Sequence, residues 1–153
     1  MDTINLETKS KIATLAQQQL HSQLAEIKQQ LTDLSSSSAG EEKSSAGDKY
    51  ETQREMIKQS QDILDQQASR IREMIHQLER VPLQACDKVR EGALVKLPMG
   101  WIWVSVALGK VVDGDQEYLL VSKDSPLFLA VRGLQVGESA VFRGKTVVVE
   151  EVV

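Results

Sequence analysis

Cysteine, proline and aromatic residues are scarce in this sequence of 153 residues. The single cysteine, Cys86, excludes a disulfide framework and a zinc site built from several cysteines. Aromatic residues make up 4% of the chain, so few large side chains are available to fill a core. With 41% hydrophobic residues over this length, the chain suits one domain or two small ones, and a large barrel or doubly wound enzyme is not expected.

The chain also lacks an excess of basic residues and any long apolar run. Its net charge of −4 argues against a general nucleic-acid coat, which needs a basic surface. The longest nearly apolar stretch, residues 101–108, falls far below the roughly 20 residues that span a bilayer. The first ten residues lack the apolar core of a secretory signal. We therefore expect a cytoplasmic protein with no membrane association.

No catalytic or nucleotide-binding motif stands out. The sequence has no G-x-G-x-x-G after a predicted strand and no G-x-x-x-x-G-K-[ST]. His21 and His76 are far apart and lack a metal-binding spacing, so we interpret both as ordinary helix residues. Cys86 has no evident activating partner, and we interpret it as packing near the joint between the two halves. The chain is therefore not expected to be an enzyme on its own.

The two halves of the chain differ in composition. All 16 valines, all three prolines, both tryptophans and both phenylalanines lie at or after Val81, whereas 12 of the 15 glutamines lie before it. Valine favours strands, while glutamine, leucine, lysine and glutamate tolerate helices well. Pro82 is a natural stop for the last helix. We therefore predict an α+β protein, with a helical domain over residues 1–81 and a mostly β domain over residues 82–153.

Apolar residues in the helical half recur mostly at steps of three and four. One run comprises Leu20, Leu24, Ile27, Leu31 and Leu34, and the other comprises Ile57, Leu64, Ala68, Ile71, Ile75 and Leu78. Such spacing is typical of the narrow seam of a coiled coil. The segment 35–48 is rich in serine and glycine, which disfavour helix and let the chain reverse. The sequence therefore predicts an antiparallel coiled coil, a thin rod whose hydrophilic tip spans about residues 35–50.

Acidic residues gather at this predicted tip. The charged positions are Glu41, Glu42, Asp48, Glu51 and Glu55, interleaved with Lys43, Lys49 and Arg54. Asp48 and Glu51 have the spacing of a capping box, with aspartate replacing serine or threonine, and negative charge is favourable at a helix N-terminus. The same carboxylates could instead bind a metal ion or a partner. The residue types leave both interpretations open.

The second half is expected to form about five strands and one short helix. The strands are predicted at residues 92–97, 101–108, 117–122, 139–142 and 145–152, with the last two forming a hairpin about Arg143-Gly144. Ser125 before Pro126 is typical of an N-cap followed by a first-turn proline. A helix is therefore predicted over residues 126–132, closed by Gly133.

Trp101 and Trp103 alternate with apolar neighbours and so share one face of their predicted strand. Two interpretations are open for them. In the first, the two tryptophans form an exposed partner-binding patch. In the second, which we favour, they lie on an edge strand and pack beneath the helical rod.

The order of these parts, together with one stretch of sequence, resembles a known family. Residues 122–127, S-K-D-S-P-L, lead through residues 129–138, L-A-V-R-G-L-Q-V-G-E. This stretch is similar to a serine-proline, short-helix and V-G-[DE] segment of the Gre transcript-cleavage factors of bacterial RNA polymerase, and residues 141–152 are similar to their closing hairpin. The resemblance implies a C-terminal domain of FKBP-like fold without isomerase activity. It also implies RNA polymerase as the partner, with contacts from Lys49, Arg54, Ser125, Pro126 and Leu127.

The tip provides a second resemblance. Gre factors carry a glycine-aspartate pair with a glutamate three residues after the aspartate, and residues 47–51, G-D-K-Y-E, fit that pattern. In the family these carboxylates enter the secondary channel of the polymerase, close to the nascent RNA, and help to hold a second Mg²⁺ at its active site. Mg²⁺ prefers oxygen ligands, and two metal ions can activate water for phosphodiester hydrolysis. The resemblance therefore implies that Asp48 and Glu51 share a Mg²⁺ with the polymerase.

Several alternatives remain open at this point. Residues 52–54, T-Q-R, depart from the family pattern. If Tyr50 is instead aligned with the family tyrosine, Asp48 and Glu51 no longer match the family acids. Glu41 and Glu42 would then replace them, or the protein would bind the channel without stimulating cleavage. A second class of function is a chaperone-like coiled-coil module unrelated to polymerase. A third class is a prolyl isomerase, although the pocket of such an enzyme needs clustered aromatic residues. A rod that enters a channel is expected to be a monomer.

Overall fold

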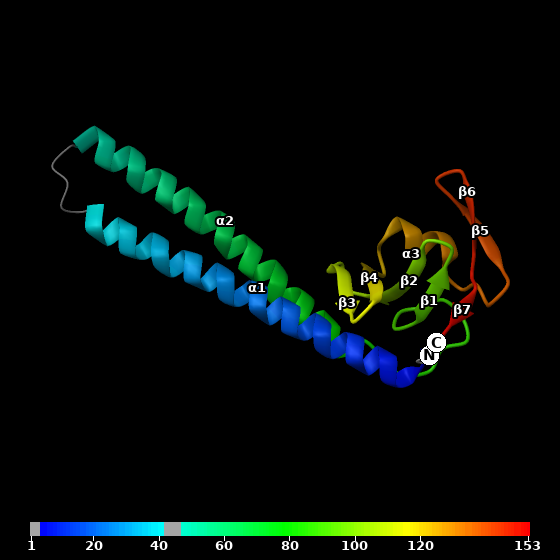
Figure 1. The fold of residues 1–153 in the computed structure, drawn as a ribbon. Helices are drawn as coiled ribbons and strands as arrows, with labels where there is room; N and C mark the ends of the chain where they lie inside the picture. Colours follow the sequence, from blue (N-terminus) through cyan, green and yellow to red (C-terminus); the bar gives the residue numbers. More distant parts are fainter. Residues whose placement is uncertain (1–3, 42–46) are drawn as a thin grey trace. The chain divides into compact units, whose positions relative to one another are not determined.

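The computed structural model describes the backbone of residues 4–41 and 47–153, and the side chains in these ranges outside residues 37–50. Two long helices come first, α1 (Leu6–Glu41) and α2 (Gly47–Arg80) (Figure 1). Seven strands and a short third helix follow within the described residues. The predicted α+β class, with a helical hairpin before a small sheet domain, is confirmed.

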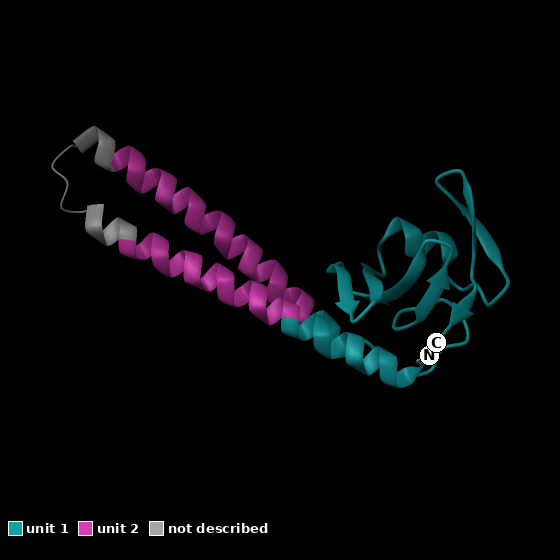
Figure 2. Ribbon diagram, in the orientation of Figure 1, with its two compact units in different colours: residues 1–18, 76–153 teal, residues 19–75 magenta. Residues whose placement is uncertain are grey.

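The chain divides into two compact units (Figure 2). One unit comprises residues 1–18 and 76–153, and the other comprises residues 19–75. The division therefore passes through both long helices. The sequence-based domain limits, 1–81 and 82–153, describe a different partition and stay a prediction.

The predicted apolar seam is visible in the unit of residues 19–75. Buried side chains from both helices form it, namely Leu20, Leu24, Ile27, Ala68, Ile71 and Ile75. Closer to the turn between the helices the seam residues are only half-buried, as for Leu31, Leu34, Ile57 and Leu64. Among the described residues, no helix is both long enough and apolar enough to cross a bilayer.

Helix α1 extends further than the sequence predicted. The expected break spanned residues 35–48, but α1 continues to Glu41 and α2 begins at Gly47. Serine costs less than about 0.7 kcal/mol per residue relative to alanine in a helix, and each added residue of an existing helix gains a backbone hydrogen bond. An established helix can therefore continue through a short serine run.

The larger sheet contains five strands in the order β3-β4-β2-β1-β7. Their bounds are β1 (Leu94–Leu97), β2 (Gly100–Ser105), β3 (Gly109–Asp113), β4 (Gln116–Ser122) and β7 (Glu151–Val152). Strands β2 and β4 are parallel, and the other neighbours are antiparallel. The single strand predicted over residues 101–108 is wrong in length, because β2 ends at Ser105 and a separate strand begins at Gly109. The positive φ of Gly109, 93°, suits the turn between them.

Helix α3 (Pro126–Val131) begins where the sequence predicts. The Oγ of Ser125 accepts a hydrogen bond from the backbone N–H of Phe128 at 3.1 Å, and Pro126 occupies the first turn. Gly133 follows the helix with a φ of 80°. The predicted N-cap and closing glycine are confirmed, and the helix is one residue shorter than expected.

Strands β5 (Ser139–Phe142) and β6 (Lys145–Val148) form the predicted hairpin. Arg143 and Gly144 both have positive φ, 51° and 78°, which is the backbone geometry of a two-residue type I′ turn. The predicted last strand, residues 145–152, is divided in the structure. Its end leaves the hairpin and pairs as β7 with β1 in the larger sheet.

The core of the sheet domain contains valines from several elements together with one phenylalanine. Its buried members are Val89, Ala93, Val95, Leu97, Ile102, Val104, Phe128, Val131, Val147 and Val149. Trp101 and Trp103 are also buried, so the exposed patch proposed for them is wrong. Their predicted edge position is wrong too, because β2 lies between β4 and β1. The Nε1–H of Trp103 donates to the carbonyl oxygen of Gly92 at 3.1 Å, which satisfies the buried indole.

Candidate functional site

Three of the four predicted acid positions lie on the two long helices, close to where one helix ends and the next begins. Glu41 is the last residue of α1, and Asp48 is the second residue of α2. Glu51 lies on α2 with its side chain exposed. Glu42 lies outside the described residues, as do the side chains of Glu41 and Asp48. The backbone therefore places three of the four positions close to one end of the hairpin.

Positions 48 and 51 are three residues apart in a continuous helix, and so they share one face of α2. Position 48 also lies in the first turn, where unpaired backbone N–H groups and the helix dipole favour negative charge. Capping and metal binding both remain predictions for Asp48 and Glu51. Among the described side chains, those of residues 4–36 and 51–153, no group of three or more histidine, cysteine, aspartate and glutamate residues is arranged to hold a metal ion by itself.

The other predicted contact residues lie on both parts of the chain. Arg54 is exposed on α2, whereas the side chain of Lys49 lies outside the described part. Pro126 is exposed, and Leu127 is half-buried against the core of the sheet domain. Because the Oγ of Ser125 already caps α3, this serine has a structural role whether or not a partner binds beside it.

The helix pair exposes apolar side chains that the seam pattern did not predict. Met56 and Ile63 on α2 are 61% and 56% exposed and lie seven residues apart, which places them on the same helix face. A groove of about 460 Å³ is lined by Leu34 of α1 and by Ile63 and Leu64 of α2, among others. Clustered exposed apolar surface often marks a contact site, so this face is a candidate for partner contact.

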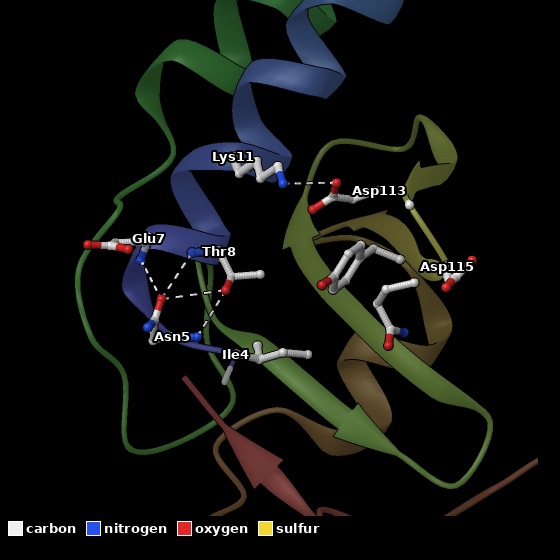
Figure 3. Close-up of a pocket in the computed structure, with 10 residues that line it drawn as sticks. Ile4, Asn5, Glu7, Thr8, Lys11, Asp113 and Asp115 are labelled. Atoms are coloured by element: carbon white, nitrogen blue, oxygen red, sulfur yellow. Dashed lines mark hydrogen bonds and ion pairs between the residues drawn. The ribbon is translucent and has the colours of Figure 1, made fainter. Parts of the chain in front are cut away.

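A polar pocket of about 1020 Å³ lies at the start of α1, next to the turn between β3 and β4 (Figure 3). The Oδ1 of Asn5 accepts hydrogen bonds from the backbone N–H groups of Glu7 and Thr8 at 3.0 and 3.3 Å. The backbone N–H of Asn5 in turn donates to the Oγ1 of Thr8 at 3.1 Å. This reciprocal arrangement is a form of the capping box, and the sequence pattern N-x-x-T is the local signal that identifies it.

One ion pair joins two residues that line this pocket. The Nζ of Lys11 lies 3.1 Å from the Oδ1 of Asp113 (Figure 3). The side chain of Lys11 is 63% exposed, so the pair contributes only about 0–1 kcal/mol. Tyr118 also lines the pocket and is itself buried. Burial raises the pKa of the Tyr118 hydroxyl above 10.0, and the negative charge of Asp113 raises it further.

Because its pKa is raised, the Tyr118 hydroxyl is expected to ionise at a higher pH than an ordinary tyrosine does in the folded protein. The chain has two tyrosines, so a Tyr50→Phe variant leaves Tyr118 as the single phenol whose ultraviolet absorbance reports ionisation. Because the folded state favours the neutral phenol, its stabilising contribution is complete below pH 10 and is lost as the pH rises through the folded pKa. Asp113→Asn should lower the titration midpoint. A midpoint at the ordinary value in folded protein would contradict this environment.

The structure brings together two residues that the sequence analysis did not connect. Cys86 was interpreted as having no activating neighbour, but the Nζ of Lys9 lies 3.7 Å from its Sγ. These residues are 77 positions apart, so no local pattern could have joined them.

His76 lies 3.9 Å from a carboxylate oxygen of Glu79, one helical turn away on the exposed surface of α2.

No family model matches the chain, and no curated protein matches it. One solved structure is described as that of the transcription factor Gfh1, with 20% identity, a TM-score of 0.36, and coverage of 90% of this chain and 93% of that chain. Another is the GreA factor homolog 1 (Gfh1) protein of Thermus thermophilus, with 20% identity, a TM-score of 0.31, and coverage of 89% and 93%.

Proposed function

We propose that this protein is a Gre-like regulator of transcript elongation, which binds bacterial RNA polymerase by placing its helical hairpin in the secondary channel. The observation that carries the proposal is the position of the acidic residues. Carboxylate positions of α1 and α2 flank the same chain reversal, between Glu41 and Gly47. The resemblance of residues 122–138 to the Gre segment, which includes the confirmed N-cap at Ser125, supports the same assignment.

The dimensions of the helix pair suit this role. Segments 19–41 and 47–75 would extend about 35 and 45 Å at 1.5 Å per residue. Two packed helices have axes only about 8–10 Å apart, so the pair is narrow enough to enter a channel. Its exposed apolar residues, Met56 and Ile63, would then contact the channel wall.

Asp48 and Glu51 are the residues we propose as ligands, with Glu41 and Glu42 as the alternates. Carboxylate oxygens are the ligands that Mg²⁺ prefers, and one or two of them can complete a site whose other ligands come from a second molecule. Mg²⁺ bound there would support water activation and leaving-group stabilisation in phosphodiester hydrolysis. The present chain would contribute ligands and position only, so we propose that it is not an enzyme on its own.

Purified stalled elongation complexes with end-labelled RNA test the proposal. Adding the protein together with Mg²⁺ is expected to shorten the RNA faster than polymerase alone does. Altered pausing without shortening would support channel binding and contradict the cleavage role. If the protein neither binds polymerase nor changes elongation, the proposal is wrong, and the alternative of an unrelated coiled-coil interaction module is favoured.

A further inference from the structure

A buried amine and a partly exposed thiol face each other near the start of α1. The Lys9 side chain is fully buried, with 0% exposed, and its Nζ donates to the carbonyl oxygen of Gln84 at 2.6 Å. The Sγ of Cys86 donates to the same carbonyl oxygen at 3.4 Å and lies 3.7 Å from Nζ. One carbonyl group therefore holds both reactive atoms side by side within a single compact unit.

The surroundings of Lys9 favour its uncharged form relative to an exposed lysine. Burial lowers the pKa of the Lys9 amine, and the positive charge of Arg90 lowers it further, while the neighbouring Cys86 acts in the opposite direction. An uncharged lysine amine is a nucleophile, as in enzymes that form Schiff bases. Cys86 retains partial exposure, so a small oxidant can reach its sulfur.

We propose that Lys9 and Cys86 form an oxidative modification site, in which peroxide converts the contact into a covalent bond between Nζ and Sγ. In the first step hydrogen peroxide oxidises the thiol to a sulfenic acid, the O–O bond breaks, and one water leaves. In the second step the amine of Lys9 attacks the sulfur and the S–O bond breaks. The departing hydroxide takes a proton from nitrogen and leaves as a second water. The product is a sulfenamide with two hydrogen atoms fewer than the reduced protein.

The geometry supports closure of this bond. The flexible four-carbon stem of lysine allows Nζ to move toward sulfur once the thiol is oxidised. The bond would join positions 77 residues apart, and so it would restrict the unfolded chain as a disulfide of the same loop length does. The modification would therefore raise the midpoint temperature of unfolding.

The test exposes the full-length protein to stoichiometric hydrogen peroxide and maps its peptides without reducing agent. We expect the peptide containing Lys9 to be joined to the one containing Cys86, with a loss of two hydrogen atoms that a thiol reductant reverses. The midpoint temperature should rise in the same sample and return on reduction. Neither Lys9 nor Cys86 takes part in the proposed function, and the test needs no polymerase.

Three variants make the test decisive. Lys9→Met keeps a long apolar side chain but lacks the amine, so oxidation should stop at a sulfenic acid that a cyclic 1,3-dione probe captures. Cys86→Ser should abolish both products. Lys11→Met removes an exposed lysine of the same helix and should leave the bond unchanged. If wild-type Cys86 gains oxygen while Lys9 remains free to react with an amine label, or if Lys9→Met yields the same joined peptides, the proposal is wrong.

Discussion

Replacing Asp48 with asparagine and Glu51 with glutamine together is expected to reduce the stimulated RNA cleavage rate to that of polymerase alone. Each amide keeps the size of the side chain it replaces but removes the negative charge that a hard cation requires. Binding to polymerase should change little, because most of the helix surface is unaltered. The measurement is RNA shortening in stalled complexes at several Mg²⁺ concentrations, with binding recorded in parallel.

The matched control lies on the same helix. Asp62 and Asp65 are both exposed on α2 and have the same three-residue spacing as Asp48 and Glu51. Changing both to asparagine removes two charges without altering the tip, and cleavage should stay at the wild-type rate. Equal losses in the two double variants would assign the effect to net charge. Full cleavage by the Asp48 and Glu51 variant would exclude these two carboxylates as ligands and direct the test to Glu41 and Glu42.

Replacing Trp103 with alanine is expected to lower the free energy of unfolding by about 3–5 kcal/mol. The side chain is completely buried, on a strand with neighbours on both sides, so truncation leaves a cavity that the sheet cannot easily close. The change also removes the donor to the Gly92 carbonyl oxygen. Since domains of this size are stable by roughly 5–15 kcal/mol, a large part of the stability would be lost. Urea unfolding followed by circular dichroism measures the change.

Two further variants separate the contributions at this position. Trp103→Phe keeps an aromatic ring but removes the Nε1–H donor, so it should cost less than the alanine variant. Leu129→Ala removes an apolar side chain that is 55% exposed and should alter the free energy of unfolding by no more than about 0.5 kcal/mol. Similar losses in the free energy of unfolding for Trp103→Ala and Leu129→Ala would show that Trp103 is not part of a packed core.

Features that depend on neighbouring residues were predictable from the sequence. The three-and-four spacing identified the helix seam, because residues one turn apart share a helix face whatever the rest of the chain does. Ser125 before Pro126 located the start of α3, since an N-cap depends on a hydrogen bond only three residues away. Arg143-Gly144 located the hairpin, because its turn geometry requires backbone conformations that glycine adopts easily.

The candidate site was predictable in part. The sequence placed the acidic positions at the chain reversal, and the backbone of α1 and α2 agrees with that placement. The extent of the reversal was overestimated, because residue preferences describe isolated positions and not the cooperative extension of a helix already formed. Metal binding by these carboxylates stays a prediction, because the proposed site would need further ligands from a partner, which this chain does not encode.

By itself, the sequence determined the fold class, the two long helices with the acidic residues near the turn that joins them, and the short third helix. The tertiary structure alone decided the parallel pairing of β2 with β4, the transfer of the chain end from the hairpin to β1, and the contact between Lys9 and Cys86. The physical reason is the distance along the chain over which each kind of interaction acts. Periodicity and capping act within a few residues, whereas strand neighbours and buried side-chain contacts depend on how segments far apart in the chain exclude water together.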